Sequence, residues 1–228
     1  MKVKALWVLA AVCLVASAAF GSTLYSQPSV WTTNGDNVGS GWTSQVDSGS
    51  NGYRAFDNFS ISTTSQVTTF KWYGIYLNSQ LANGAPNTST WDVSIFADNA
   101  GAPGSSVYSD GTASVSSSLV GSGVFSGPVD LYEFTYTFTS PFTAVGGQTY
   151  WISPLSQATN FFDFFSWTMG TGGDNATFQQ YLSSGSVAGT YNRPNDRAFE
   201  LDGTPVPEPA SLVLLGSGLV GIIRRIRK

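Results

Sequence analysis

Residues 131–138 read Leu-Tyr-Glu-Phe-Thr-Tyr-Thr-Phe, and this stretch decides the fold class of the chain. From Tyr132 to Phe138 every second residue is aromatic, and Glu or Thr stands between the aromatic residues. Successive side chains of a β-strand point to opposite faces of the sheet, so this alternation places the aromatic rings on one buried face. The stretch predicts a half-buried strand that contributes an aromatic face to the core.

Other stretches predict further strands. Residues 91–98 alternate in the same way, whereas residues 67–77 are apolar on both faces, which predicts a central strand. Shorter candidates lie at 150–153, 161–167 and 197–201, and turn-forming residues are concentrated at 34–37, 83–86, 98–104 and 170–175. The Ser- and Gly-rich residues 105–126 are expected to form one long hairpin. Together these patterns predict an all-β single domain with a β-sandwich or jelly-roll-like fold.

Length and composition agree with this fold class. The chain has 228 residues, and residues 22–203, which lie between two terminal sorting segments, are enough for one sizeable core. Aromatic residues make up 14 % of the chain and charged residues only 11 %, while Gly, Ser, Thr and Asn are frequent between them. Such a composition favours strands and turns over helices.

The charges are distributed unevenly along the chain. Residues 22–203 contain thirteen acidic and four basic residues, which gives this body a net charge of −9. An acidic domain repels nucleic acid and anionic membrane surfaces. Nucleic-acid binding is therefore not expected.

The body lacks the two residue types that most often carry enzyme and metal chemistry. The chain contains no His, and its single cysteine, Cys13, lies in the N-terminal segment. A Ser-His-Asp triad, a histidine zinc site, a cysteine nucleophile, a disulfide and a thiolate metal site are therefore impossible in the body. The sequence predicts no cofactor and no metal site.

Residues 1–21 have the order of a secretory signal peptide. Lys2 and Lys4 form a positive start, residues 5–16 are apolar, and small residues follow at 16–19. Cleavage after Ala18, Ala19 or Gly21 would fit this order. The segment implies export by the Sec translocon and removal by signal peptidase.

Two alternatives for this segment are an uncleaved anchor helix and a lipoprotein signal. The apolar run is short for an anchor and ends in small residues. Val12 before Cys13 is too bulky for a lipoprotein signal, and the apolar run continues past the cysteine.

The C-terminal segment, 204–228, has three parts in order. Residues 203–205 read as a linker, and the motif Val206-Pro207-Glu208-Pro209 follows. An apolar run over 210–223 comes next, and the chain then reaches a basic cytoplasmic stop made of Arg224, Arg225, Arg227 and Lys228. A helix over 210–223 would rise about 21 Å, which is less than the roughly 30 Å hydrocarbon core. The basic stop is expected to stay cytoplasmic, which leaves the body outside.

This three-part order resembles the PEP-CTERM sorting signal, which in its family is recognised and processed by an exosortase. The resemblance implies export through the inner membrane of a Gram-negative bacterium and transient anchoring there by the C-terminal helix. Removal of the tail would then leave the body at the cell surface or secreted. A plain C-terminal anchor is the alternative, although such an anchor has no need of the Pro-Glu-Pro motif.

Parts of the body also resemble the domain common in secreted PEP-CTERM proteins. The similar stretches are Ala55-Phe56-Asp57-Asn58-Phe59, Ile95-Phe96-Ala97-Asp98-Asn99 with Pro103-Gly104, Thr149-Tyr150-Trp151, and Asp196-Arg197-Ala198-Phe199-Glu200-Leu201. This resemblance supports a β-sandwich and implies no catalytic residue.

The first functional hypothesis is a non-catalytic surface or matrix protein that binds exopolysaccharide. Indole rings stack on sugar rings, and Asn or Asp side chains hydrogen-bond hydroxyl groups. Trp91 and Trp167 lie on regular strand patterns and are expected in the core. Trp31 and Trp42 lie among Gly, Thr, Ser and Asn, so they are the predicted ligand-stacking residues.

Two alternatives use carboxylates. A glycoside hydrolase needs only two carboxyl groups, and Glu133 and Glu200 are the only glutamates of the body, but both alternate with core aromatic residues as solvent-facing positions would. A calcium-stabilised adhesive or structural protein would need oxygen ligands from loops. The candidates for such ligands are Asp98, Asn99 and Asp110, or Asp174 and Asn175, and none has the spacing of a known calcium loop.

Overall fold

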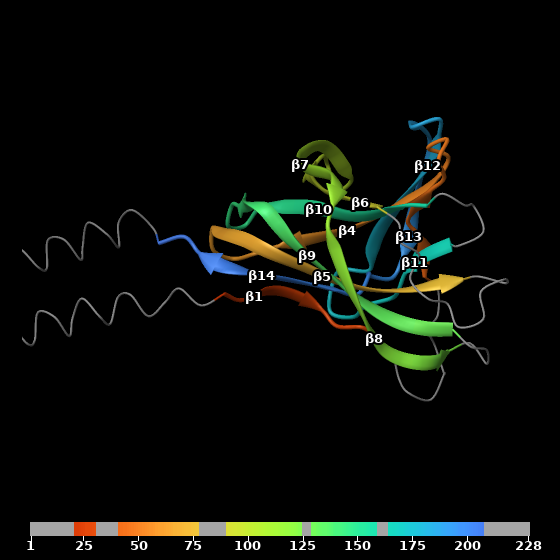
Figure 1. The fold of residues 1–228 in the computed structure, drawn as a ribbon. Coiled ribbons are helices and arrows are strands. Elements are labelled where there is room, and N and C mark those ends of the chain that lie inside the picture. Colours follow the sequence, from red (N-terminus) through yellow and green to blue (C-terminus); the bar gives the residue numbers. More distant parts are fainter. Residues whose placement is uncertain (1–20, 31–40, 78–89, 125–128, 159–163, 208–228) are drawn as a thin grey trace, which may run out of the picture.

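The computed structural model describes residues 21–30, 41–77, 90–124, 129–158 and 164–207. Figure 1 shows an all-β body in which two sheets pack together as a sandwich. The helices predicted at the two ends of the chain lie outside the described residues. Within the described ranges, no helix has the length and apolar character needed to cross a bilayer.

The first sheet has a central strand flanked on both sides. Its strands are β1 (Ser22–Gln27), β2 (Trp42–Thr43), β5 (Ser65–Leu77), β8 (Val115–Val124), β9 (Val129–Ala144), β11 (Phe164–Trp167) and β14 (Phe199–Pro205). β5 pairs with β9 along one edge and with β14 and β11 along the other. The prediction of a central strand over 67–77 is therefore confirmed.

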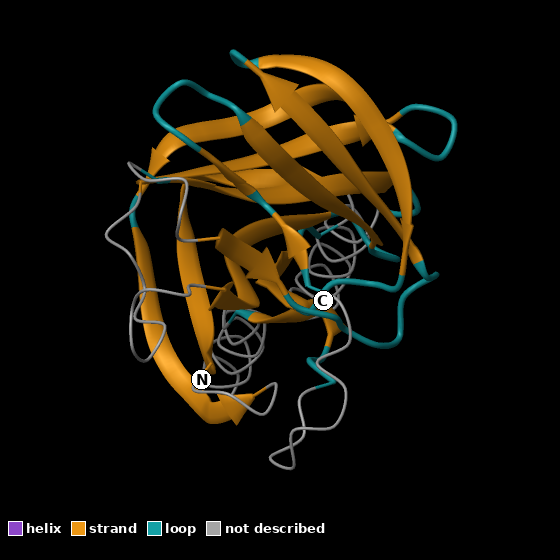
Figure 2. Ribbon diagram, turned by 90° about the vertical axis from the view of Figure 1, so that its right-hand side faces the viewer, coloured by secondary structure: helices purple, strands orange, loops and turns teal. Residues whose placement is uncertain are grey.

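The second sheet lies against the first, and Figure 2 shows the strands as two layers. Its strands are β3 (Gln45–Val46), β4 (Gly52–Ser60), β6 (Thr90–Asp98), β7 (Pro103–Ala113), β10 (Thr149–Gln157), β12 (Ala176–Ser183) and β13 (Ser186–Pro194). They follow the order β13-β12-β4-β3-β10-β6-β7, so β13 and β7 form the two edges. The predicted strands 91–98 and 150–153 lie within β6 and β10.

Aromatic rings from both sheets form the core between them. Phe134 of β9 is 1 % exposed, and its ring centroid lies 5.6 Å from that of Trp72 in β5 and 5.1 Å from that of Trp91 in β6. Trp91 belongs to the opposite sheet, so these contacts join the two layers. Trp167 of β11 is also fully buried. The predicted core positions of Trp91 and Trp167, and the aromatic face of residues 131–138, are confirmed.

The prediction of a single hairpin over residues 105–126 is wrong. β7 pairs with β6 in the second sheet, whereas β8 pairs with β9 in the first sheet. The chain crosses between the layers around Ser114, with Ala113 buried and Val115 packed against the core. A Ser- and Gly-rich strand carries little apolar pattern, so its sequence does not reveal which sheet it joins.

The linker expected at residues 203–205 is instead the end of a strand. Gly203, Thr204 and Pro205 belong to β14 and pair with residues 65–67 of β5. A Cβ atom at position 203 would lie 2.0 Å from the carbonyl oxygen of Gln66, so the glycine permits this close approach of the two strands. The small residues that suggested a linker therefore serve strand packing.

Candidate functional site

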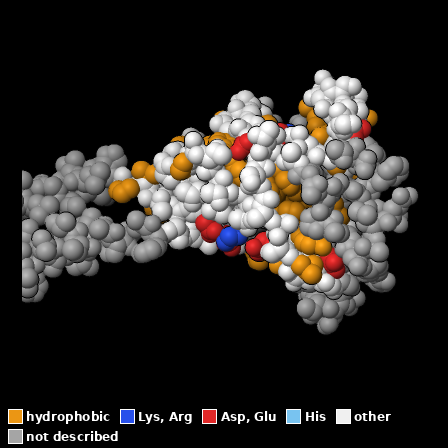
Figure 3. Space-filling model, in the orientation of Figure 1, with side chains coloured by type: hydrophobic (Ala, Val, Ile, Leu, Met, Phe, Trp, Pro, Cys, Tyr) orange, Lys and Arg blue, Asp and Glu red, His pale blue; other side chains and the backbone are white. Residues whose placement is uncertain are grey.

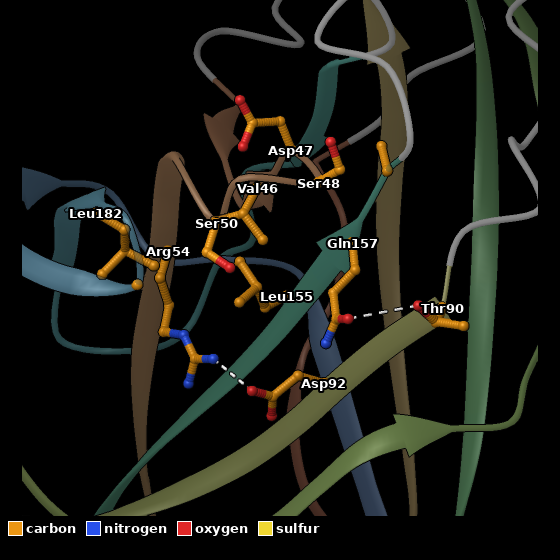
Figure 4. A pocket seen from close by; sticks show the side chains of 12 residues that line it. Val46, Asp47, Ser48, Ser50, Arg54, Thr90, Asp92, Leu155, Gln157 and Leu182 are labelled. Carbon is orange, nitrogen blue, oxygen red and sulfur yellow. Dashed lines mark hydrogen bonds and ion pairs between the residues drawn. The ribbon is translucent and has the colours of Figure 1, made fainter.

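The outer face of the second sheet contains a groove, which we define as a cavity of about 380 Å³ between β3, β4, β6, β10 and the turn from β12 to β13. The floor of the groove is a small apolar cluster of Val46, Leu155 and Leu182. Side chains alternate between the two faces of a strand, so these three can lie on the outer face, away from the main core. Figure 4 shows polar side chains standing around this floor.

An ion pair lies in the wall of the groove. Nη2 of Arg54 donates to Oδ2 of Asp92 over 2.5 Å, and the two side chains are only 14 % and 16 % exposed. The hydroxyl of Ser94 donates to Oδ1 of Asp92 over 2.5 Å. The guanidinium of Arg54 also lies 5.7 Å from the ring of Phe96. The pair is therefore fixed in position and sheltered from bulk water.

Other polar groups complete the rim of the groove. Gln157 accepts a long hydrogen bond from Thr90 (3.5 Å) and donates to the carbonyl oxygen of Gly111 (3.1 Å). Oδ1 of Asp47 accepts the backbone N–H groups of Gly49 and Asn51, both at 2.8 Å, and so shapes the turn on the opposite side. The groove combines an apolar floor with donors and acceptors whose positions are set by strands.

The outer face also carries aromatic rings, but these rings cover one another. Phe56 packs edge-on against Phe96 with centroids 5.2 Å apart, and Trp151 packs edge-on against Phe178 at 5.1 Å. Trp151 is 1 % exposed. Its indole N–H donates to Asp98 over 2.8 Å. This bond joins β10 to the end of β6 and so supports the fold.

The two predicted stacking residues differ in what the structure shows. Trp31 lies outside the described residues. Trp42 of β2 is half-buried, and the guanidinium carbon of Arg193 lies 4.5 Å from its ring centroid. Its indole N–H donates to the carbonyl oxygen of Pro194 over 3.3 Å. A sugar ring at Trp42 would have to share the indole with this guanidinium, and the stacking role stays a prediction.

The two glutamates lie together on the outer face of the first sheet, as half-buried residues. Glu133 accepts the hydroxyl proton of Tyr73 over 2.8 Å, and Glu200 accepts from Nζ of Lys71 over 2.7 Å. Burial, together with the hydrogen bond to Glu133, raises the pKa of Tyr73 to about 12. Glu200 lines a second cavity of about 310 Å³ with Tyr73. Glu133 does not line this cavity.

The aspartates named as candidate calcium ligands accept hydrogen bonds from neighbouring groups. The two carboxylate oxygens of Asp98 accept from Trp151 and from the backbone of Gly101. Those of Asp110 accept from the backbone of Thr112 (3.2 Å) and from the hydroxyl of Tyr136 (2.7 Å). Those of Asp174 accept from the backbone of Ala176 (2.9 Å) and from the side chain of Asn58 (2.8 Å). Among the residues that the structure describes, no three acidic side chains gather as a metal site would need.

A buried polar network was not predicted from the sequence. Asp57 is fully buried and accepts the backbone N–H groups of Asn58 (2.7 Å) and Arg197. The amide of Gln27, oriented to suit its neighbours, donates to Asp57 (2.9 Å) and to the carbonyl oxygen of Arg197 (2.6 Å). Burial raises the pKa of Asp57, and the two backbone N–H groups oppose this effect.

Arg197 is the cationic member of this network. Its guanidinium donates to the carbonyl oxygens of Asn195 (2.8 Å) and Trp167 (3.2 Å), and burial lowers its pKa to about 10. The network joins β1, β4 and the segment before β14, and it connects the stretch around Asp57 with the stretch around Arg197. Both stretches therefore act as internal scaffold.

At the C-terminal end, the folded body reaches directly to the sorting segment. The backbone N–H of Val206 donates to the carbonyl oxygen of Thr64 over 2.8 Å, and Pro207 is the last described residue. Glu208, Pro209 and the basic stop at 224–228 lie outside the described residues.

Comparison with protein families matches residues 205–228 to the PEP-CTERM protein-sorting motif. The matched region begins at Pro205, the last residue of β14. Comparisons with curated proteins and with solved structures give no match. The prediction of the sorting signal is confirmed: the chain carries a PEP-CTERM protein-sorting motif at its C-terminus, which marks it as an exported protein sorted by an exosortase.

Proposed function

We propose that this protein is a non-catalytic cell-surface or secreted protein whose body binds neutral exopolysaccharide in the groove. Export would use the N-terminal signal peptide, and the C-terminal helix would hold the chain transiently in the inner membrane until the exosortase acts. The observation that supports the binding role best is the fixed ion pair of Arg54 and Asp92 beside an apolar floor.

The chemistry of the groove suits a sugar. A pyranose presents C–H groups on one face and hydroxyl groups around its edge, so it can rest on apolar side chains while its hydroxyls exchange hydrogen bonds with the rim. Asp92 is an acceptor, and a guanidinium has five N–H donors, of which the described contacts of Arg54 use one for Asp92. The opposite charges of the pair balance each other, and the carboxylate of Asp47 adds one negative charge to the lining, which disfavours an anionic ligand.

The same contacts argue against catalysis in the groove. A general acid or base must be able to exchange a proton with the substrate. Both carboxylate oxygens of Asp92 already accept hydrogen bonds, one from the Arg54 guanidinium and one from the Ser94 hydroxyl. The body also has no histidine.

A glycan array with the processed protein, followed by titration with the best ligand, tests the proposal. The double variant Arg54→Met with Asp92→Leu removes both charges together, so neither is left unpaired. Charge-assisted hydrogen bonds contribute about 1.5–3 kcal/mol each, so we expect binding to weaken about tenfold to a hundredfold. The matched control is Lys71→Met with Glu200→Leu and Asp202→Asn, which removes the ion-paired charges of the other sheet together and should leave binding unchanged. Equal losses in both variants would refute the assignment to the groove.

The pH dependence separates this proposal from a histidine-dependent or catalytic one. The groove has no histidine in its lining, and no other side-chain type there has an ordinary pKa between about pH 5 and 8, so binding should be constant over that range. Release of reducing sugar that is abolished by Glu133→Gln or Glu200→Gln would show a glycoside hydrolase instead.

The predicted stacking residues remain part of the proposal as a separate contact. Loss of a ring that stacks on a sugar is expected to weaken binding by about 1–3 kcal/mol, by analogy with aromatic residues that stack on nucleic-acid bases. Trp31→Ala and Trp42→Ala test this contact, provided that thermal melting shows an intact fold.

A further inference from the structure

One end of the sandwich carries both ends of the described chain. β1 runs antiparallel to β14, and Ser22 lies opposite Gly203. In Figure 1 the first residues of β1 and the last residues of β14 lie side by side at this end of the body. The hydrogen bond from Val206 to Thr64 shows that β-pairing continues to the first residue of the Val-Pro-Glu-Pro motif. No linker therefore separates the body from the sorting motif.

This junction limits how far the body can stand from the membrane. The apolar run of the tail begins at about residue 210. Four residues of extended chain span at most about 14 Å, so this is the greatest distance between Val206 and the start of the anchor. While the tail is in the bilayer, this end of the body must lie close to the lipid headgroups.

Three segments that pair at this end contain no charged side chain. Pairing brings together residues 60–66, 139–149 and 203–207, because Pro205 lies opposite Ser65, Ser65 opposite Ala144, and Thr149 opposite Ser60. These three segments contain no Asp, Glu, Lys or Arg, although the body as a whole has a net charge of −9. In Figure 3 the surface beside the grey tails is white and orange, and the red and blue side chains lie farther along the body.

Two carboxylates that lie close to these segments in the sheets, Asp202 and Asp98, are engaged, and Glu208, which follows Pro207, lies outside the described residues. Asp202, next to Gly203, forms an ion pair with Lys71 at 2.8 Å. Asp98, at the corresponding end of β6, accepts from Trp151 and from its own turn. Among the exposed residues of these segments is Val145, which is 41 % exposed. An acidic protein is repelled by anionic lipids, and an uncharged end with an exposed apolar side chain minimises that repulsion where the tail forces contact.

We propose that this end, formed by residues 60–66, 139–149 and 203–207, is a membrane-docking surface for the phospholipid headgroups of the bilayer that holds the tail. The groove lies at the opposite end. β10 begins at Thr149 beside the docking surface and ends at Gln157 in the groove, about 26 Å away at 3.3 Å per residue. In the anchored protein the docking surface therefore contacts the membrane, and the groove lies at the end of the body that points away from it.

Site-specific fluorescence quenching on the full chain tests this orientation. Cys13→Ser removes the only native thiol, and single cysteines are then introduced as Val145→Cys on the docking surface and Ser186→Cys at the far end. Each is labelled with an environment-sensitive fluorophore, and the chain is inserted into vesicles of phosphatidylethanolamine and phosphatidylglycerol that contain a headgroup-linked nitroxide quencher.

The label at position 145 should lose most of its fluorescence, and the label at position 186 should lose none. A chain of residues 22–207, which lacks both apolar terminal segments, is the control and should be quenched at neither position. Equal quenching at both positions, or no quenching at position 145 while the tail is inserted, would overturn the proposal.

A charge variant tests the physical reason. Ser62→Asp with Thr63→Asp adds two negative charges to exposed positions of the docking surface, whereas Thr190→Asp with Asn192→Asp adds the same charge to exposed positions of β13. We expect only the first variant to lose quenching at position 145 on anionic vesicles, with recovery at high salt because salt screens charge. If both variants behave alike, the uncharged end has no part in docking.

Discussion

The strongest test of the core is the removal of the Phe134 ring. This side chain is 1 % exposed and stacks on Trp72 with centroids 5.6 Å apart and planes 13° from parallel. It also contacts Trp91 in the other sheet and Phe165 in β11, at 5.1 and 5.5 Å. Rigid rings cannot collapse fully into the space that Phe134→Ala leaves, so a cavity should persist.

The expected cost of Phe134→Ala is about 3–5 kcal/mol, the usual range for emptying a large aromatic core site. A domain of this size shifts its melting temperature by about 2–4 °C per kcal/mol, so the variant should melt roughly 6–20 °C lower. Tyr136→Ala should cost about as much, because that ring is also 1 % exposed and its hydroxyl donates to Asp110.

The neighbouring Thr135 provides the control. It faces away from the core on the same strand and is half-buried, so Thr135→Ala should cost under about 1 kcal/mol. Urea denaturation at equilibrium, followed by tryptophan fluorescence, gives the free energy of unfolding of each variant. If Thr135→Ala proved more damaging than Phe134→Ala, the register of β9 and the core derived from it would be refuted.

Three further predictions follow from the buried network, the tyrosines and the tail. Asp57→Ala leaves backbone N–H groups unpaired and removes one of the two carboxylates that stabilise the Arg197 cation, so it should lower the free energy of unfolding in urea by about 3–5 kcal/mol; a cost under about 1 kcal/mol would contradict this. Burial raises the pKa of Tyr25 and Tyr73 from 10 to about 12, so their neutral forms stabilise the fold below pH 10 and this stability is lost as the pH rises from 10 to 12. Burial also raises the pKa of Tyr132 and Tyr136, so ultraviolet titration should show at least four tyrosines that ionise late in the folded protein and at the ordinary pKa in denaturant; identical curves would be the contrary result. Intact mass of surface-released protein should show a chain that ends within residues 206–209, and retention of residues 224–228 would show that the tail is not removed.

The sequence alone revealed the features that depend on short, local patterns. Alternation around Phe134 identified a strand and its buried face, because side-chain direction in a strand depends only on sequence parity. The sorting signal was readable for a related reason: a partner reads it as a linear segment, so its three parts must follow one another along the chain. The absence of histidine excluded whole classes of catalytic site without any structure.

Long-range pairing could not be predicted in this way. Residues 105–126 are strand-forming, but only the tertiary structure decided that β7 joins one sheet and β8 the other. Likewise, residues 203–205 have the composition of a linker, and only the proximity of Gln66 shows that a glycine is needed there for strand packing. In both places the deciding contact is remote in sequence, and local composition contains no information about it.

The candidate site was decided almost entirely by the tertiary structure. Arg54 and Asp92 are 38 residues apart, and the floor beside them comes from β3, β10 and β12. Asp57 and Arg197 are 140 residues apart, so neither could be assigned a partner from its own surroundings in the chain. The sequence specifies which side chains point outward from each strand. The order of the strands in the sheet then decides which of these side chains come within reach of one another. That order results from the packing of the whole aromatic core.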